Sequence, residues 1–247
     1  MSTETIKSTI QSRYDQLAAN ELTRHGSYES LTRAKAYFRT RKLTTALQLG
    51  AFPPGSKVLE VGCSVGQFTV PLAERGYDVH GVDLSPNAIA VAKQRRAEQG
   101  VLRLVFSIGD AERLEAFADN TFDGMVSFST LRYVPRLSTA LTEIRRVLKP
   151  GARAVVDFPN RWCPWFYLKP WLGSERHPHD RWFTAREARR TLEEAGFRDL
   201  HVRTLLFTPT VLPDRLLGLF RVIDGIGERT PLVNRLAGVI MVSAAKP

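Results

Sequence analysis

A glycine turn and one acidic residue are the features of this sequence whose types and spacing indicate a chemical function. Val58–Val61 is an apolar run interrupted by Glu60, and it leads directly into Gly62. Asp83 ends the next apolar segment, 21 residues after Gly62. In a strand–turn–helix unit, an acidic residue at that place binds ribose hydroxyls, because the first turn holds the rest of the nucleoside. The pattern therefore predicts a bound nucleoside; a tight turn beside a solvated carboxylate is the alternative.

The spacing of the glycines indicates which class of nucleoside cofactor the turn can bind. A turn that binds a pyrophosphate needs the pattern G-x-G-x-x-G, because backbone amides must approach the phosphates closely. Here three residues separate Gly62 from Gly66, and Ser64 stands between them. The turn also lacks the Lys-Ser/Thr pair of a phosphate-binding P-loop. The sequence therefore predicts a cofactor that has a ribose but no phosphate.

Apolar strands alternate with helical segments around this turn. Pro86–Gln99 is the clearest helix, since Ser85 can cap its first turn and Gly100 follows its end. The expected strands are Lys57–Val61, Asp78–Val82, Leu102–Ile108, Phe122–Phe128 and Arg153–Phe158, and the other expected helices are Gln67–Arg75 and Leu137–Leu148. This alternation predicts an α/β fold: a doubly wound, Rossmann-like, mostly parallel sheet that binds ligands at the carboxyl ends of its strands.

The two ends of the chain depart from the alternation. Residues 1–50 have a helical pattern that stops at Pro53, and residues 161–183 hold all four tryptophans. The later expected elements are the helix Thr184–Ala195, the strand Phe197–Phe207, the helix Pro213–Ile226 and the strand Gly238–Ala245. We therefore expect seven strands, with an antiparallel C-terminal edge strand. We expect one domain over 1–247, made of a helical cap (1–50), a cofactor-binding core (51–160), an aromatic flap (161–183) and a C-terminal part of the sheet (184–247).

The amino-acid composition indicates which binding partners and which cellular compartment to expect for this protein. The chain has 247 residues and a net charge of +10, to which residues 51–160 contribute only +1. Basic flanks serve nucleic acid, an anionic membrane, an anionic substrate or solubility alone. The sequence has no apolar stretch of about 20 residues and no N-terminal signal core. Cys63 and Cys163 form neither a disulfide framework nor a metal cluster. We expect a metal-free, soluble, cytoplasmic protein.

Six segments together resemble the class I S-adenosylmethionine-dependent methyltransferases, in the branch of quinone-biosynthesis and other small-molecule methyltransferases. They are VLEVGCSVGQF, GVDLS, GDAERL, FDGMVSFSTLRYV, LKPGARAVVDF and FTAREARRTLEEAGF, and they cover about residues 35–205. The resemblance implies S-adenosylmethionine as the cofactor. It also implies methyl transfer to an O, N or C atom of a small acceptor.

The resemblance assigns roles to individual residues. Gly62 and Gly66 would line the methionine part of the cofactor, and Asp83 would hold its ribose. Asp110 and the Ala111 amide would face the adenine. The remaining cofactor candidates are Glu60, Cys63, Leu84, Ser127, which would lie near the sulfonium, and Arg41, which would bind the cofactor carboxylate unless it is merely solvated. Ser64 replaces the usual middle glycine, which is tolerable because no phosphate approaches it.

Residues for the acceptor are less defined. Arg132 and Tyr133 stand where many relatives carry paired histidines, so a histidine base is not expected there. Methyl transfer needs alignment more than a base, and the pool of bases is Tyr133, His177, His179 and Asp157. Tyr14 and Tyr28 either close over the cofactor or pack in the core. The expected acceptor site consists of Arg132, Tyr133, Trp162, Trp165 and Tyr167, which suit an aromatic or lipid-like acceptor with an anionic group.

Other functions compete with this one. RNA and DNA base methyltransferases of this kind carry an Asn/Asp-Pro-Pro-aromatic motif after the fourth strand, where this chain has Ser127-Phe128-Ser129-Thr130. Nucleic acid is therefore not the expected partner. A non-catalytic protein that binds S-adenosylmethionine is the second alternative. The helix Pro213–Ile226 either packs in the core or makes a peripheral membrane contact.

Overall fold

The computed structural model describes residues 2–24, 32–168, 179–209 and 213–247, and the side chains of residues 20–24 are not described. Tyr28, Trp171 and His177 lie outside the described residues, as does much of the expected flap 161–183. Within the described ranges, none of the helices is long and apolar enough to cross a membrane.

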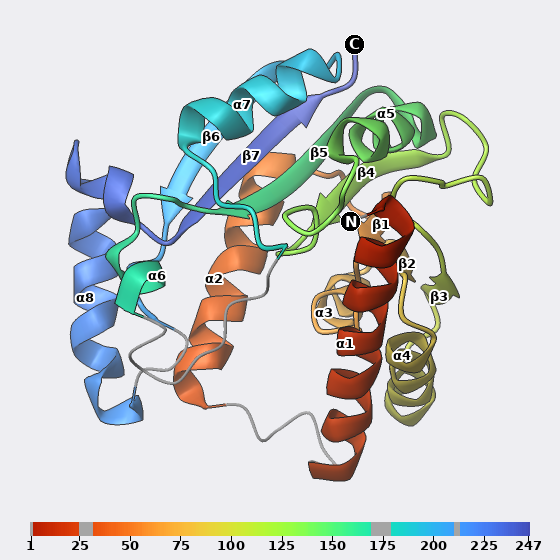
Figure 1. Ribbon diagram of the computed structural model, residues 1–247, viewed down its shortest axis with the longest axis horizontal. Helices are drawn as coiled ribbons and strands as arrows, with labels where there is room; N and C mark the ends of the chain where they lie inside the picture. The colour runs from red at the N-terminus through yellow and green to blue at the C-terminus, as the bar shows by residue number, and fades with distance from the viewer. Residues whose placement is uncertain (1, 25–31, 169–178, 210–212) are drawn as a thin grey trace.

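Seven strands form one sheet in the order β3-β2-β1-β4-β5-β7-β6 (Figure 1). β1 to β5 are mutually parallel. The strand bounds are β1 Lys57–Val61, β2 Asp78–Asp83, β3 Leu104–Ile108, β4 Phe122–Ser127, β5 Leu148–Pro159, β6 Arg198–Leu205 and β7 Val239–Ala245. The mostly parallel, doubly wound sheet predicted from the sequence is therefore confirmed. The chain reverses its direction of winding between β1 and β4, and ligands of such sheets bind beside that point.

Helices cover both faces of the sheet (Figure 1). On one face α2 (Arg33–Gly50), α3 (Thr69–Glu74) and α4 (Pro86–Gln99) pack on buried strand residues such as Val58 and Val126. On the other face α5 (Leu137–Val147) and α7 (Ala185–Glu194) enclose the core around Met125 and Val156. α1 (Thr3–Arg24) lies against α4 rather than on the sheet. The layered arrangement leaves the carboxyl ends of the central strands beside α1 and α2.

Local sequence determines several of the helix ends. The Ser85 side chain accepts a hydrogen bond from the backbone of Ala88, and Gly100 ends α4 in the left-handed region, so this helix has its predicted bounds. Thr184 and Glu187 form the reciprocal capping box of α7. The expected helix Gln67–Arg75 is shorter at both ends, because residues up to Phe68 belong to the turn after β1.

The predicted antiparallel pair is β6 and β7. The last strand, β7, lies one place in from the edge, between β5 and β6, and is antiparallel to both. Its residues are buried from Val239 to Ala244, whereas β6 is exposed or half-buried along most of its length. A strand buried on both faces and both sides needs two neighbouring strands, so the less apolar β6 forms the edge.

The segment between β6 and β7 packs beside α2 at the end of the molecule farthest from β3 (Figure 1). It consists of the short helix η2 (Asp214–Leu216), α8 (Leu217–Gly227) and the short helix η3 (Val233–Leu236). The expected helix Pro213–Ile226 therefore begins as a 3-10 turn. α6 (Pro164–Leu168) lies against α8, where the rings of Trp165 and Phe220 are 6.0 Å apart.

Candidate active site

A cavity of about 700 Å³ lies at the carboxyl ends of β1, β2 and β4. Its walls are the turn after β1, the ends of β2 and β4, the loop after β3, and one side each of α1 and α2. The volume is in the range of small-molecule sites, which hold about 300–1,000 Å³. The cavity is therefore at the place where the sequence predicts the nucleoside.

Gly62 makes the turn after β1 possible. Its φ is +80°, a region that favours glycine, and its N–H donates to the Val82 carbonyl at 2.7 Å. A Cβ atom at this position would lie 2.0 Å from Oγ1 of Thr130. The same Thr130 hydroxyl donates to the Gly62 carbonyl at 3.2 Å. Only glycine therefore fits, and the turn is held against both β2 and the loop after β4.

Asp83 is oriented toward the cavity by backbone donors. The N–H of Ser64 donates to its Oδ2 at 2.8 Å, and the N–H of Ser85 donates to its Oδ1 at 2.9 Å. Ser64 reaches this geometry with a φ of +48°, in the place of the usual middle glycine. Burial raises the pKa of Asp83 despite these bonds. Each carboxylate oxygen keeps a free lone pair, so the group can accept hydrogen bonds from a pair of ribose hydroxyls.

Glu60 is a second acidic group of the cavity, with a different environment. It is fully buried, and the hydroxyl of Thr69 donates to its Oε2 at 2.5 Å. Burial raises the pKa of Glu60 to about 8. The carboxyl group is therefore mostly protonated at neutral pH. A cationic ligand group beside it would favour the ionised form.

Lys42 closes the cavity on the side of α2. Its Nζ lies 2.5 Å from Oδ2 of Asp157 and 2.8 Å from Oγ of Ser129. The rings of Phe38, Phe68 and Phe128 surround the ammonium group at 5.5–5.7 Å. The ammonium and the carboxylate are both almost completely buried, and the backbone N–H of Ser129 also donates to Asp157. Asp157, one of the candidate bases, is therefore already engaged by two partners.

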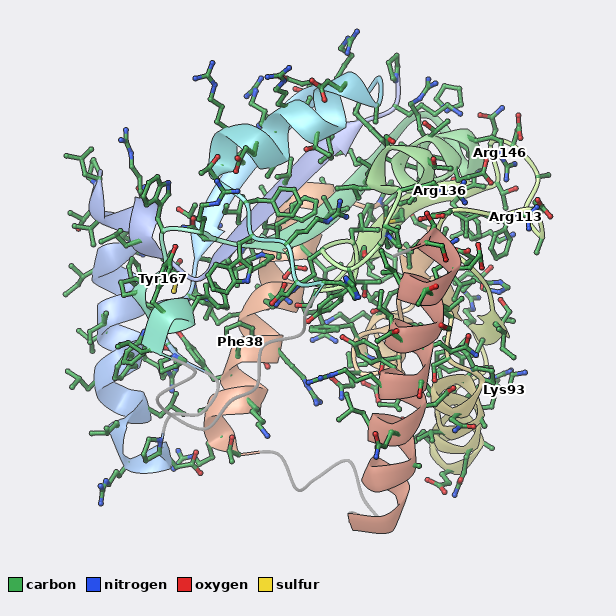
Figure 2. All side chains as sticks on the ribbon, in the orientation of Figure 1. Phe38, Lys93, Arg113, Arg136, Arg146 and Tyr167 are labelled. Atoms are coloured by element: carbon green, nitrogen blue, oxygen red, sulfur yellow. The ribbon has the colours of Figure 1, made fainter. Side chains whose placement is uncertain are left out.

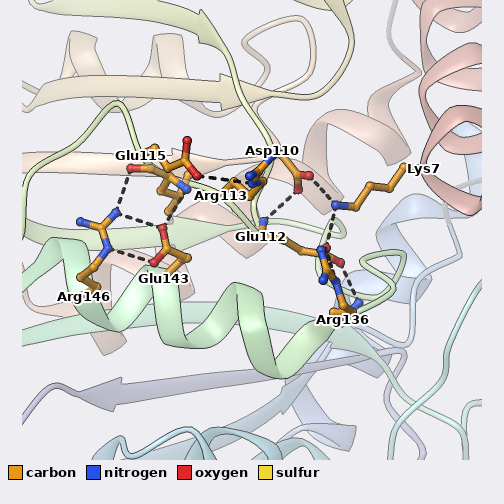
Figure 3. Close-up of polar contacts among 9 residues, drawn as sticks. Lys7, Asp110, Glu112, Arg113, Glu115, Arg136, Glu143 and Arg146 are labelled. Atoms are coloured by element: carbon orange, nitrogen blue, oxygen red, sulfur yellow. Dashed lines mark hydrogen bonds and ion pairs between the residues drawn. The ribbon is translucent and has the colours of Figure 1, made fainter. Parts of the chain in front are cut away.

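A network of charged residues joins α1 to the loop after β3 (Figure 3). Nζ of Lys7 lies 2.5 Å from Asp110 and 2.6 Å from Glu112. Arg136 approaches the same Glu112 carboxylate at 2.8 Å. Burial alone would raise the pKa of Glu112, but hydrogen bonds from Lys7 and Arg136 lower it below its usual value. Since Asp110 and Ala111 line the cavity, this network fixes its predicted adenine side.

Two tyrosines face the cavity from opposite elements. Tyr14 of α1 and Tyr133 of the loop after β4 both line it, and their rings are 6.0 Å apart, edge to face. Burial raises the pKa of Tyr14, and the neighbouring Tyr133 raises it further. Tyr14 is therefore a neutral phenol at physiological pH. Of the two alternatives for this residue, contact with the ligand site is the one that its position supports.

Three residues predicted to contact the ligands are not among those that line the cavity. Arg41 forms an ion pair with Glu228 of the segment before β7, at 2.6 Å, because it lies on the side of α2 that faces α8. Ser127 is buried and donates to the Val61 carbonyl at 2.8 Å, so it links β1 to β4 beneath the cavity. Arg132 pairs with Asp180 through two of its guanidinium nitrogens, Nε and Nη2. None of these three described side chains lines the cavity.

The aromatic residues expected on the acceptor side also lie elsewhere. Nε1 of Trp165 donates to the Phe207 carbonyl at 2.8 Å, which fixes this ring beside α8. Trp162 and Tyr167 are exposed, and Figure 2 marks Tyr167 on α6. His179 is half-buried and, like these three aromatic residues, does not line the cavity. Within the described part of 161–183, α6 packs against α8 through Trp165, whereas Asp180 pairs with Arg132 and Phe183 packs in the core. None of these described residues is a wall of the cavity.

The sequence reasoning missed several lining residues on α1 and α2. Lys35, Phe38, Arg39 and Lys42 follow the spacing i, i+3, i+4, i+7, which is one face of a helix. This helical register can be read from the sequence, and it places Lys42 and not Arg41 on the side of α2 that lines the cavity. Lys7 had no such signal, because its partner Asp110 is 103 residues away in the chain.

Comparisons with known proteins agree with this geometry. Residues 59–156 match the family described as "Methyltransferase domain". Phosphoethanolamine N-methyltransferase 2 of Caenorhabditis elegans is 34% identical over 110 residues, which are 44% of this chain and 25% of that protein. A ubiquinone biosynthesis O-methyltransferase of Cereibacter sphaeroides is 26% identical over 223 residues, which are 84% of this chain and 90% of that protein. Among solved structures, the [4+2]-cyclase SpnF superposes with a TM-score of 0.68 at 25% identity, covering 96% of this chain and 95% of that one.

The lining of the cavity fits the cofactor of this family. Asp83 offers a carboxylate for ribose hydroxyls, and the Asp110–Ala111 loop lies next to it. Glu60 and the stacked rings of Phe68 and Phe128, 4.0 Å apart, suit cationic ammonium and sulfonium groups. Residues 59–156 therefore form a methyltransferase domain of the S-adenosylmethionine-dependent kind, and S-adenosylmethionine is its cofactor.

Proposed function

We propose that this chain transfers a methyl group to an O, N or C atom of a small acceptor that is aromatic or lipid-like and carries an anionic group. The observation that carries the proposal is the lining contributed by α2. There the phenyl ring of Phe38 stands between the cations Lys35 and Arg39. An apolar ring flanked by cations matches a flat or apolar molecule with one negative group. The relatives named for ubiquinone biosynthesis and for phosphoethanolamine support an acceptor of this size.

The chain contributes mainly alignment and the exclusion of water. When bound, the cofactor supplies a methyl carbon that its sulfonium activates for in-line displacement. Asp83 and the turn at Gly62 fix the nucleoside end of the site, and the paired rings of Phe68 and Phe128 line the other end beside Lys42. Holding the two reactants in line makes the bimolecular reaction effectively unimolecular. This alignment accelerates methyl transfer without a base.

A strong base is not part of the proposal. Tyr133 is the candidate base that lines the cavity among the described residues, and it is hydrogen-bonded to the neutral phenol of Tyr14. The hydroxyl groups of these two tyrosines can orient an acceptor hydroxyl or amine by hydrogen bonding. We therefore propose a positioning role for Tyr133. The acceptor atom then has to be nucleophilic at neutral pH or to lose its proton late in the reaction.

Nucleic acid remains the less suitable acceptor. The Asp157-Phe158-Pro159-Asn160 segment resembles a base-stacking motif in composition, but Phe158 is packed in the core and Asn160 is buried. The Asn160 amide donates to the carbonyls of Arg235 and Ala237, at 2.7 Å each. A flipped base could not stack on side chains held in this way.

A second candidate function is catalysis without methyl transfer. It is favoured by one observation, the near-complete superposition on a protein described as a [4+2]-cyclase. In this case the cavity would bind S-adenosylmethionine and leave it unconsumed. A non-catalytic protein that binds the cofactor would behave in the same way toward the methyl group.

The test is transfer of a labelled methyl group from S-adenosylmethionine. The protein is incubated with an organic-solvent extract of cells and, in parallel, with total RNA, at low and high salt. We expect label in the organic extract at both salt concentrations, because a buried pocket is screened weakly. Label confined to RNA and abolished by moderate salt would contradict the small-molecule proposal, since phosphate contacts depend steeply on salt. Cofactor binding without any transfer would favour the second candidate.

A further inference from the structure

The outer side of α8 is apolar. Leu219, Val222, Ile223 and Ile226 follow the spacing i, i+3, i+4, i+7, and their exposed fractions run from 37% to 63%. The opposite side of the same helix is the packed one, where Leu217, Asp224 and Gly227 are buried. A surface helix normally presents polar residues to water. α8 therefore has an apolar stripe on the side where a water-exposed helix would be polar.

Neighbouring elements extend this stripe. Exposed apolar side chains continue from α8 into both short helices, and the apolar face consists of Leu216, Leu219, Val222, Ile223, Ile226, Leu232, Val233 and Leu236. Two exposed aromatic residues with polar groups, Trp162 and Tyr167, lie next to it on the segment that packs against α8. Clusters of exposed apolar side chains mark interaction sites, and Trp and Tyr are enriched where apolar and aqueous phases meet.

The exposed charges around the apolar face are mostly positive. Arg215, Arg221, Arg229 and Arg235 are exposed. Two of the three acidic residues of the same segment, Asp224 and Glu228, are engaged inside the protein, and Asp214 is exposed. Asp224 accepts hydrogen bonds from the backbone of Phe207 and Thr208, and Glu228 is held by Arg41. Asp214 accepts a hydrogen bond from the first turn of α2. The outward surface is therefore apolar with a cationic border, in a chain of net charge +10.

We propose that this face binds the surface of an anionic lipid bilayer, with α8 lying parallel to the membrane plane. Apolar side chains enter the acyl boundary and arginines meet the anionic headgroups. A second copy of the chain is a poorer occupant. A two-fold interface places the same patch on both partners, so the arginines would face arginines.

The contact would bring the cavity close to the membrane. α2 is shared between the two sites, since Ala34 and Tyr37 pack against α8 while Lys35 and Phe38 line the cavity. One helix therefore separates the apolar face from the candidate active site (Figure 1). The proposal goes beyond the proposed function and does not depend on the identity of the acceptor.

Vesicle flotation tests it. The full chain is mixed with phosphatidylcholine vesicles and with vesicles that contain about 30% phosphatidylglycerol. We expect flotation with the anionic vesicles, and a decrease at high salt. The double variant Leu219→Glu/Ile226→Glu should bind at least about tenfold more weakly, because it places charges in the acyl boundary. Leu102→Glu is the matched control, since Leu102 is an exposed leucine before β3, on the far side of the sheet.

The cationic border is tested separately. Arg229→Gln/Arg235→Gln should lower binding to anionic vesicles and leave cofactor binding unchanged, whereas Lys93→Gln on α4 should leave both unchanged. Absence of flotation with either vesicle would overturn the proposal. So would equal binding of the Leu219→Glu/Ile226→Glu variant, or a dimer in sedimentation equilibrium that this variant dissociates. Since lipid binding is measured without acceptor, its failure is distinguishable from a failure of methyl transfer.

Discussion

Asp83 and Glu60 are carboxyl groups of one cavity whose environments give them different tasks. Two backbone N–H groups donate to Asp83, which orients it and supports its charge. Glu60 is fully buried and receives one hydroxyl hydrogen bond, so burial dominates and raises its pKa to about 8. The first group is a ready acceptor of hydrogen bonds. The second carries a proton that the arrival of a cationic ligand can displace.

The protonation of Glu60 predicts how stability depends on pH. In the folded chain its pKa is about 8, and its usual value is 4.5, so between these values the folded state holds a proton that the unfolded state has lost. The free energy of unfolding therefore falls as pH rises from about 4.5 to 8 and is insensitive to this group above that range. Glu60→Gln should flatten the dependence and stabilise the protein at pH 8 by roughly 1–3 kcal/mol, because the neutral amide has no charge to bury. Urea unfolding at pH 5 and pH 8 measures this.

Glu112 is the control for that experiment, because its pKa is displaced in the opposite direction. Because the pKa of Glu112 is lower in the folded chain than its usual value, the ionised carboxylate stabilises the fold at pH values above that usual pKa. This stabilisation is lost as the pH falls through the pKa of the folded state. Glu112→Gln should therefore destabilise the protein at neutral pH. An unfolding profile of Glu60→Gln with the same slope as the unmodified chain would contradict the assigned protonation of Glu60.

At the scale of elements, α1 forms a wall of the cavity and is attached to α4 and to the loop after β3. Ala18 packs with Val65 and Val91, and Asp15 accepts a hydrogen bond from the Ser85 hydroxyl. Near its start, Lys7 holds the helix to the Asp110–Glu112 loop (Figure 3). Because α1 packs on α4 and a loop and not on the sheet, it can move away while the sheet stays intact, which suits a wall that must admit a ligand.

Removing the Lys7 attachment should change the rate at which cofactor leaves. Lys7→Met loses two charged hydrogen bonds between α1 and the loop after β3, so we expect the dissociation rate to rise about tenfold, with little change in association. Displacement of bound cofactor by excess product, followed by stopped flow, measures the rate. Lys93→Met, an exposed lysine on α4, should leave it unchanged. An unchanged rate in Lys7→Met would mean that α1 does not gate the cavity.

Some features of the helices and strands could be predicted from the sequence, and others could not. The bounds of α4 and the cap of α7 follow from local hydrogen bonding, and they were predictable from Ser85, Gly100, Thr184 and Glu187. The turn at Gly62 and its partner Asp83 were predictable because their spacing follows from a single strand–turn–helix unit. The inward placement of β7 and the Lys7–Asp110 contact depend on packing between distant segments, which no local pattern encodes. Arg41 and Lys42 are neighbours in the chain, and only the helical register of α2 distinguishes the one that faces the cavity.

At the scale of the whole molecule, the two sides of α2 face different surroundings. One side lines the cavity and the other supports α8, so the candidate active site and the proposed lipid-binding face share a structural element. The excess positive charge lies in the flanking segments that build these surfaces, while residues 51–160 are nearly neutral. The sheet provides the cofactor site, and the flanks supply the surfaces on which acceptor and membrane would be recognised.

The central claim is that Asp83, at the end of β2, binds a ribose beside a glycine turn that makes no phosphate contacts. Isothermal titration calorimetry with S-adenosylmethionine and with NAD tests this claim most directly. We predict that the unmodified chain binds S-adenosylmethionine and not NAD. Asp83→Asn should weaken the binding roughly ten- to hundredfold, the usual value of a hydrogen bond to a charged group. Asp78→Asn, at the exposed start of β2, should bind as the unmodified chain does. Tight binding of NAD without S-adenosylmethionine, or equal binding by Asp83→Asn, would contradict the account.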